Sequence, residues 1–258
     1  MSTSWTTLDL SPAAGPAPTG RRVLRHVVTE AKLLARNGEQ LLLALVIPAG
    51  LLLLAPVVHG RFGLDLAGLQ PSVLALAVWS SAFTSTAIAT GFERRYGVLE
   101  RLATTPLGRP GLIMGKVGSV LLVIIAQIAV LTAIGLATGW RPRITALSTV
   151  VVLGCTVLAI TTFVALALAL AGTLRAEATL GLANLIYLVM AVAGGLMVPL
   201  AAYPTGLRSV VTMLPTAAWG EAVRSWSAGL VIWWPVVVLA GWAAGSVLLA
   251  SKVFRWMS

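Results

Sequence analysis

Residues 93–116 read ERRYGVLERLATTPLGRPGLIMGK, and the rest of the chain is organised around them. This is the longest charge-rich segment of an otherwise apolar sequence, and it lies between two segments that are apolar enough to cross a membrane. Gly97 is a poor helix residue that suggests a hinge, and Pro106 suggests a stop. The pattern predicts a short amphipathic helix on the membrane surface, although an ordinary basic loop between two spans would carry similar charges. At about 100° per residue, Tyr96, Leu99, Leu102, Ala103 and Pro106 share one side, and Arg94, Glu100, Arg101 and Thr104 share the other, with only Arg95 misplaced.

The same segment carries the motif Glu93-Arg94-Arg95-x-Gly97-x-Leu99-Glu100-x-Leu102, followed by Thr105-Pro106 and Gly115-Lys116. This motif resembles the signature loop of the permeases of type-2 ATP-binding-cassette (ABC-2) exporters, and a looser resemblance covers nearly the whole chain after residue 20. The similarity is closest to the drug-resistance-like actinobacterial branch, whose loops read Glu-Arg-Arg-Tyr-Gly. Many members have a second acid where this chain has Arg95, so any role of that acid is not carried over. The resemblance implies a coupling helix that sits in a groove of the ATP-binding subunit. It assigns this coupling to Glu93, Arg94, Arg95, Tyr96, Gly97, Leu99, Glu100, Arg101, Leu102, Thr105 and Pro106.

Composition places the chain in a membrane. It has 258 residues, of which 58% are hydrophobic and only 10% charged, whereas a soluble domain carries about 25% charge. The formal net charge of +10 could suggest nucleic acid, but the basic residues lie between apolar spans, so lipid headgroups and topology explain them better. The one cysteine, Cys155, lies in an apolar run and is interpreted as a packing residue. We therefore expect an all-α membrane protein and no nucleic-acid partner.

Taken in order, the chain predicts six transmembrane helices in a single transmembrane domain, residues 21–258. Residues 1–20 are interpreted as a disordered cytoplasmic tail, and residues 21–38 as a basic amphipathic helix at the membrane interface, with His26 on its solvated side. Small hydroxyl residues such as Ser81 in the second span are interpreted as packing residues. The expected spans are about 40–58, 71–92, 117–138, 144–174, 179–200 and 230–251.

The basic residues predict the orientation. With the N-terminus inside, thirteen of the 18 Lys and Arg residues lie inside and five outside. Both termini are therefore expected in the cytoplasm and the protein in the inner (plasma) membrane, with residues 93–116 facing the cytoplasm.

Residues 201–229 are too interrupted by proline to span the membrane and too apolar for a free loop, so a re-entrant or external helical hairpin is predicted. The run Gly194-Gly195-x-x-x-Pro199, then Pro204, Pro215 and Glu221-x-x-Arg224, resembles the external helices of the same family. Four tryptophans here are interpreted as an interfacial aromatic belt rather than a substrate cage. They are Trp219, Trp226, Trp233 and Trp234.

No catalytic residue and no metal site is expected. At the expected boundaries no span contains Asp, Glu, Lys, Arg or His, which disfavours an ion-coupled transporter or an intramembrane protease. The run Gly111-x-x-x-Gly115-Lys116-Val117 differs from a phosphate-binding loop in its spacing and in the residue after the lysine. Gly111, Gly115 and Gly118 are instead expected to allow close helix packing.

These features predict the permease subunit of an ATP-driven exporter and not an enzyme in its own right. A separate ATPase subunit, which holds ATP and Mg, would grip residues 93–106, with the apolar face (Tyr96, Leu99, Leu102) anchored in the bundle. Glu93, Arg94, Glu100 and Arg101 would face the ATPase. The resemblance implies two ATPase copies and two permease copies, as a homodimer or with a close homologue, and Ala191-x-x-x-Gly195 offers a dimer face.

Multidrug efflux and antibiotic resistance, with a drug-like or lipid-like substrate, are expected. A lipid or glycan exporter and a non-transporting assembly factor remain as alternatives.

Overall fold

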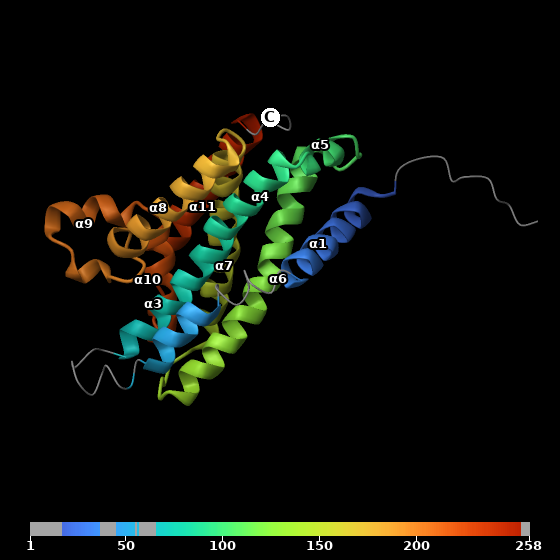
Figure 1. The fold of residues 1–258 in the computed structure, drawn as a ribbon. Helices are drawn as coiled ribbons and strands as arrows, with labels where there is room; N and C mark the ends of the chain where they lie inside the picture. The colour runs from blue at the N-terminus through green and yellow to red at the C-terminus, as the bar shows by residue number, and fades with distance from the viewer. Residues whose placement is uncertain (1–16, 37–44, 55, 57–65, 254–258) are drawn as a thin grey trace, which may run out of the picture.

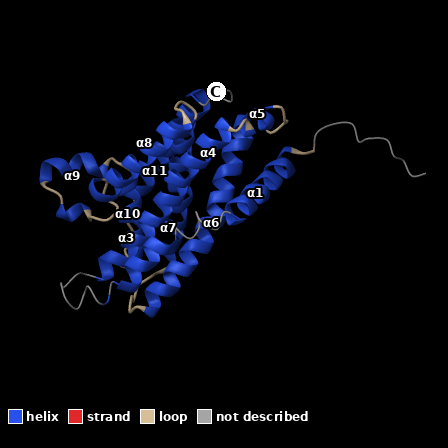
Figure 2. Ribbon diagram, in the orientation of Figure 1, coloured by secondary structure: helices blue, strands red, loops and turns tan. Residues whose placement is uncertain are grey.

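The structure is a computed structural model that describes residues 17–36, 45–54, 56 and 66–253. Within these residues every regular element is a helix and there is no strand, as Figures 1 and 2 show. The predicted all-α fold class is therefore confirmed. The helices are α1 (Thr19–Arg36), α3 (Leu66–Trp79), the π-helix η1 (Ser80–Ser85), α4 (Thr86–Arg95), α5 (Val98–Ala103), α6 (Gly108–Ala137), α7 (Ala146–Ala171), α8 (Ala176–Ala193), the 3₁₀ turn η2 (Leu200–Ala202), α9 (Thr205–Thr212), α10 (Pro215–Ser227), α11 (Trp234–Val253) and an apolar stretch Leu45–Leu54.

Five helices among the described residues are long and apolar enough to cross a membrane. They correspond to the second to sixth expected spans. They are Gly68–Arg95 (α3, η1 and α4 in one rod), Pro110–Ala137, Ala146–Ala171, Ala176–Ala193 and Trp234–Val253. Of the expected first span, only Leu45–Leu54 and residue 56 are described, and most of the expected tail, residues 1–16, also lies outside the described residues.

Three expected boundaries need correction. Helix α8 ends at Ala193 and not near 200, because the chain turns at Gly194 and Gly195, and Gly195 has a positive φ. Helix α1 already begins at Thr19, so the last two residues of the expected tail are helical. Helix α6 begins at Gly108 and not near 117, because the charges that suggested a loop there lie on the first turns of the helix. Lys116 and Glu93 consequently lie inside candidate spans, so the expectation that no span carries an ionisable residue is wrong at these helix ends.

The rod of α3, η1 and α4 is the core of the bundle. Its side chains are mostly buried, whereas α8 and α11 expose most of theirs. Around η1, the Trp79 ring stacks on Phe83 with centroids 4.3 Å apart and meets the edge of Phe163 at 4.8 Å. Ser81 Oγ donates a 2.8 Å hydrogen bond to Gln127 Oε1 of α6, which supports its interpretation as a packing residue.

The segment after α8 forms the predicted hairpin from two short helices, α9 and α10. Helix α10 is inserted between α3, α7 and α11, and Trp219 on it is 2% exposed. Its indole Nε1 donates to the carbonyl oxygen of Ala75 at 3.1 Å. The aromatic-belt interpretation is therefore wrong for Trp219, which anchors the hairpin in the core, while Trp233 is exposed.

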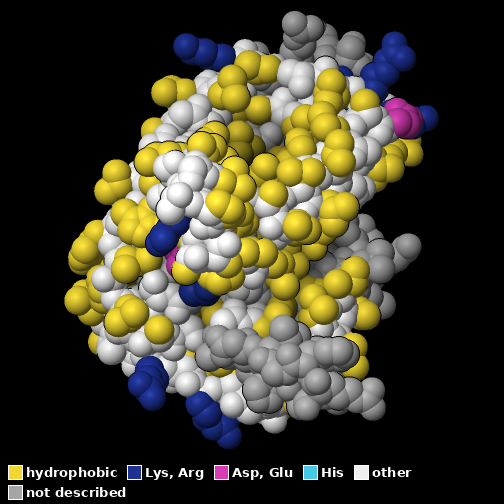
Figure 3. Space-filling model, turned by 90° about the vertical axis from the view of Figure 1, so that its left-hand side faces the viewer, with side chains coloured by type: hydrophobic (Ala, Val, Ile, Leu, Met, Phe, Trp, Pro, Cys, Tyr) yellow, Lys and Arg dark blue, Asp and Glu magenta, His cyan; other side chains and the backbone are white. Residues whose placement is uncertain are grey.

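The outer surface suits a lipid environment. Figure 3 shows hydrophobic side chains over most of the face that carries α9, with Lys and Arg gathered mainly towards its upper and lower ends. Exposed large apolar residues occur along α6, α7, α8 and α11. In water so much exposed apolar surface would promote association, so a bilayer is its natural surrounding.

We predict that Gly195→Ala destabilises the protein. Gly195 has a φ of 77°, and a Cβ there would lie 2.6 Å from Cβ of Ala217 in α10. An L-residue in this conformation costs about 1–2 kcal/mol before the clash is counted. Thermal unfolding in detergent micelles should show a lower Tm by several degrees.

The matched control is Gly245→Ala on the exposed face of α11, where an added Cβ meets nothing within 4 Å. This variant should keep the wild-type Tm. Equal Tm values for the two variants would contradict the role of Gly195 in seating the hairpin.

Candidate functional site

The charged segment, residues 93–116, begins where α4 ends at Arg95. Tyr96 and Gly97 then turn the chain, and Gly97 adopts a φ of 69° that favours glycine. The Tyr96 and Gly97 amides donate to the carbonyl oxygens of Phe92 and Arg94, which satisfies the end of α4. The expected break of the helix at Gly97 is present, and the helix that follows it is the short α5.

One face of α5 is anchored in the bundle. Leu99 is completely buried, and the half-buried Leu102 packs against the same core. Tyr96 is 69% exposed, and its ring lies 6.3 Å from the Phe92 ring. The predicted apolar anchor is confirmed for Leu99 and Leu102 and is wrong for Tyr96. A single helical wheel does not run through Gly97, because the left-handed residue changes the direction of the chain.

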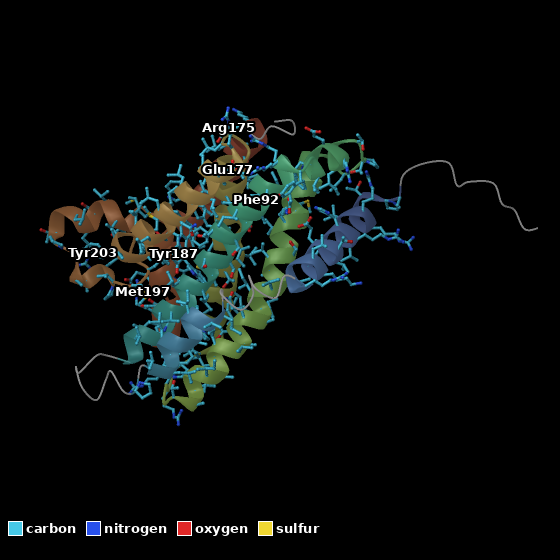
Figure 4. All side chains as sticks on the ribbon, viewed as in Figure 1. Phe92, Arg175, Glu177, Tyr187, Met197 and Tyr203 are labelled. Carbon is cyan, nitrogen blue, oxygen red and sulfur yellow. The ribbon has the colours of Figure 1, made fainter. Side chains whose placement is uncertain are left out.

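The charges at the end of α4 bond to neighbouring helices, Arg94 in a half-buried position and Arg95 at the surface. Arg94 donates to the carbonyl oxygen of Ala171 at 2.9 Å, at the C-terminus of α7 where the helix dipole favours a cation. Arg95 pairs with Glu177 of α8, which Figure 4 shows beside the end of α4. Glu93 pairs with Lys116, so both Glu93 and Arg94 are partly buried and bonded within the protein, and their expected contact with an ATPase stays a prediction. The rod of α4 extends past both residues, and they serve to tie it to its neighbours.

A buried ion cluster joins three helices at this end. Lys116 of α6 is 4% exposed, and its Nζ donates to Oε2 of Glu30 in α1 at 2.9 Å and to Oε1 of Glu93 in α4 at 2.5 Å. Charges taken out of water are tolerated only when they are paired. Removing one partner of such a pair costs about 3–5 kcal/mol, because the other charge stays buried.

Helix α1 packs closely on α6 beside this cluster. A Cβ on Gly115 would lie 2.0 Å from the His26 ring, and one on Gly118 would lie 2.7 Å from Val27. The expected close packing is confirmed for these two glycines, whereas the expected solvation of His26 is wrong. Burial lowers the pKa of His26 from its ordinary value, with Glu30 opposing and Lys116 adding to that shift, so the imidazole is neutral near pH 7. Gly111 faces the side chain of Leu107 instead of α1.

What the charged segment leaves exposed is a small surface around α5, which we term the α5 face. Its residues combine two charges, two hydroxyl groups and an aromatic ring. They lie beyond the membrane-length helices, at the end of the bundle where α5 is drawn in Figure 1. Such a surface can dock a partner without disturbing the buried contacts behind it. The exposed residues are Tyr96, Val98, Glu100, Arg101, Thr104, Thr105 and Pro106.

A second polar cluster holds the hairpin. Arg224 donates to Ser72 Oγ at 3.0 Å, to the carbonyl oxygens of Leu196 and Gly195 at 2.8 and 2.7 Å, and to Glu221 at 3.0 Å. Glu221 also accepts a hydrogen bond from the Leu200 amide at 2.8 Å. The structure thus brings together Gly195, Glu221 and Arg224, which the sequence had grouped.

The three prolines of the hairpin lie where helical turns begin. Pro199 and Pro204 precede η2 and α9, and Pro215 opens α10, a position at which the missing amide proton costs nothing. Figure 4 shows Tyr203 near α9, and its hydroxyl accepts from the Gly195 amide at 3.2 Å. The prolines therefore shape the hairpin and do not form a binding site.

Sequence reasoning missed several residues of these clusters. Glu30, Lys116, Ser72 and Glu177 were not singled out as site residues. For Glu30 the sequence offered one signal. It is a single acid on an otherwise basic helix, and its spacing places it on the same side as Arg22 and His26. Among the described residues there is no group of three or more His, Cys, Asp or Glu that could hold a metal ion.

This architecture defines a multi-pass helical membrane protein whose central rod leads into an exposed α5 face and whose later helices enclose a buried hairpin. Residues 25–226 match the family described as ABC-2 type transporter, and the chain belongs to that family. The match includes both the charged segment and most of the hairpin, so the resemblance seen in the motif is confirmed. A comparison with curated proteins finds no match. The chain is therefore the permease of an ABC transporter, and membership implies a partner subunit that binds ATP.

We predict that Arg224→Met strongly destabilises the protein. The change leaves Glu221 without its cation and two backbone carbonyls without their donor. The loss should be about 3–5 kcal/mol and should appear as a lower Tm and less folded protein in detergent.

Arg208→Met is the matched control, because Arg208 lies on the exposed side of the same hairpin in α9. It should unfold at the wild-type temperature. If both substitutions lowered the Tm equally, Arg224 would be no more than an ordinary surface charge.

Proposed function

We propose that this chain is the permease of an ATP-driven exporter in which a separate ATPase subunit docks on the α5 face. ATP and Mg bind to that subunit, and this chain performs no chemistry of its own. The observation that carries the proposal is the construction of α5. Its outer side is free, and its inner residue Leu99 is completely buried. A force applied to α5 from outside therefore acts on the packed core.

The force has a short route to the central rod. Helix α5 joins α4 through the two-residue turn at Tyr96 and Gly97, and α4 continues through η1 into α3 without a break. Arg94 and Arg95 tie the same end to α7 and α8. A displacement of α5 would therefore tilt the rod together with the ends of its neighbours. The π-helical turn η1 is a natural place for such a rod to bend.

The charge distribution supports a cytoplasmic position for the α5 face. Arg175 after α7 and Lys252 near the end of α11 lie at the same end of the bundle as α5, as Figures 1 and 4 indicate. An excess of Lys and Arg marks the cytoplasmic side of membrane proteins. We therefore assign this end, and both termini, to the cytoplasm and the protein to the inner (plasma) membrane.

We propose a second permease copy against α8. The predicted face Ala191-x-x-x-Gly195 cannot serve, because both residues are buried within the chain and Gly195 packs on Ala217. On the outer side of α8, Asn184 is exposed in the middle of an apolar span, next to the exposed Leu185 and Leu188. The Asn184 Nδ2 donates to the carbonyl oxygen of Leu180 at 3.0 Å, and a partner helix could supply further hydrogen bonds to the same exposed amide. A homodimer or a pair with a close homologue through this face would cover it.

The surroundings favour an apolar substrate. In the described spans, Lys116 and Glu93 pair with each other, Arg94 donates to a carbonyl oxygen of the bundle, and the outward surface is apolar. Such a surface suits a hydrophobic drug-like or lipid-like molecule that enters from the bilayer and is moved outward. Multidrug efflux, and with it antibiotic resistance, is the activity we propose. Export of a lipid or glycan, or a non-transporting role in assembly, would replace it if no drug-like molecule stimulated ATP hydrolysis.

We predict that reversing exposed charges on the α5 face weakens the complex with the ATPase. Glu100→Arg and Arg101→Glu each replace an attraction at the docking surface by a repulsion, which should lower the affinity about tenfold for each 1.4 kcal/mol lost. Affinity is measured by titrating the purified partner ATPase onto the permease in nanodiscs.

Arg208→Glu on α9, at the other half of the bundle, is the control and should bind normally. The Tm of every variant is measured in parallel to exclude unfolding. Unchanged affinity and unchanged ATP turnover in both α5 variants would refute the docking role.

We further expect hydrophobic drug-like molecules to stimulate ATP hydrolysis by permease and ATPase reconstituted together in liposomes, because an occupied permease favours the closed ATPase pair. Phospholipids and oligosaccharides are compared in the same assay. Stimulation by oligosaccharides alone would replace the drug-like substrate with a glycan.

A further inference from the structure

Helix α1 is held to both ends of the charged segment. Its Glu30 reaches Lys116 and, through that ammonium group, Glu93, which are the last and first residues of the segment. Its Arg22 donates to the carbonyl oxygen of Pro106 in the turn between α5 and α6. Arg22 and Glu30 lie eight residues apart, about 12 Å along the helix. The two attachments therefore bracket the segment that carries α5.

The packing between the attachments leaves little room for sliding. His26 and Val27 lie against the backbone of Gly115 and Gly118, where even a methyl group would clash. Among the described helices, α6 is the one against which α1 principally packs. The position of α1 therefore follows the position of α6 and of the charged segment.

Lysine is suited to this junction for a physical reason. Its ammonium group carries three donors and here serves two carboxylates on different helices at 2.9 and 2.5 Å. An apolar side chain at position 116 could fill the space but could not fix which parts of α1 and α4 lie opposite one another. A single buried polar residue fixes the register of coiled coils in the same way.

We propose that Lys116 is a positioning residue that makes α1, α4 and the start of α6 move as one body with α5. This inference rests on the proposed docking of an ATPase at the α5 face. Movement of α5 would then displace α1 as well as the rod, because Glu30 and Arg22 hold α1 to the two ends of the charged segment.

The first test uses the permease alone in nanodiscs, with Cys155→Ala to remove the native thiol. Spin labels are attached at the exposed positions Leu24→Cys on α1 and Arg101→Cys on α5. The wild-type background should give one narrow distance distribution. Glu30→Gln, which removes one attachment but keeps the Lys116–Glu93 pair, should broaden it, and Lys116→Met should broaden it further. Lys32→Gln, an exposed charge on the same helix, should not. Narrow distributions in Glu30→Gln and Lys116→Met would overturn the proposal whether or not an ATPase binds.

The second test uses the complete complex with its ATPase. Labels at Leu24→Cys on α1 and Val150→Cys on α7 report the movement of α1 when ATP is trapped with vanadate. The control Lys32→Gln should show a shift in distance. Glu30→Gln should lose that shift and transport several-fold less substrate per ATP hydrolysed. A cluster that only stabilises the fold would lower the Tm of Glu30→Gln and leave the shift and the transport per ATP unchanged, which would also overturn the proposal. Failure of the wild-type permease to bind an ATPase would instead refute the proposed function, and the positioning role in coupling with it.

Discussion

The requirement that a charge inside a membrane-length bundle be paired governs the arrangement of this protein. Lys116 satisfies it with two carboxylates from different helices, and the cost of leaving any one of them alone holds α1, α4 and α6 together. Glu30 and Glu93 lie 86 and 23 positions from Lys116 in the sequence. Pairing these charges therefore fixes how α1, α4 and α6 lie against one another, which local helix propensity does not determine. The exposed α5 connects α4 to α6, so this ion cluster also fixes its position.

The other half of the bundle obeys the same rule with a different partner. Arg224 donates mainly to backbone carbonyl oxygens of the turn after α8 and to Glu221. These hydrogen bonds hold the hairpin over the start of α3, so no second full span is needed there. Trp219 adds an apolar plug with one hydrogen bond to the α3 backbone. The central rod is thus clamped by ions near α5 and by a buried guanidinium near the hairpin, and its middle, at η1, is packed by aromatic rings.

Hydropathy and proline spacing were sufficient to predict the all-α class, the second to sixth spans and the hairpin. They failed where a charge belongs to a helix. Lys116 suggested a loop because its partners, Glu30 and Glu93, are distant in sequence and their approach depends on the glycines of α6. The amphipathic wheel assigned Tyr96 to the buried side because periodicity assumes a continuous helix, and the positive φ of Gly97 interrupts it. Trp219 was placed at an interface since composition alone does not tell whether a short helix is inserted between others.

These contacts bear on how an exposed α5 would transmit a push in the proposed coupling. A short helix on the surface of a membrane protein would ordinarily absorb a push by bending its own connections. Here its connection to α4 is a single tight turn, its connection to α6 is held by Arg22 at Pro106, and its inner side is filled by Leu99. With both connections short and the interior close-packed, a displacement has to be passed on to the rod, because a packed core resists compression. Along that rod the π-helical turn η1 interrupts the regular α-helix, and such turns are frequent at functional sites.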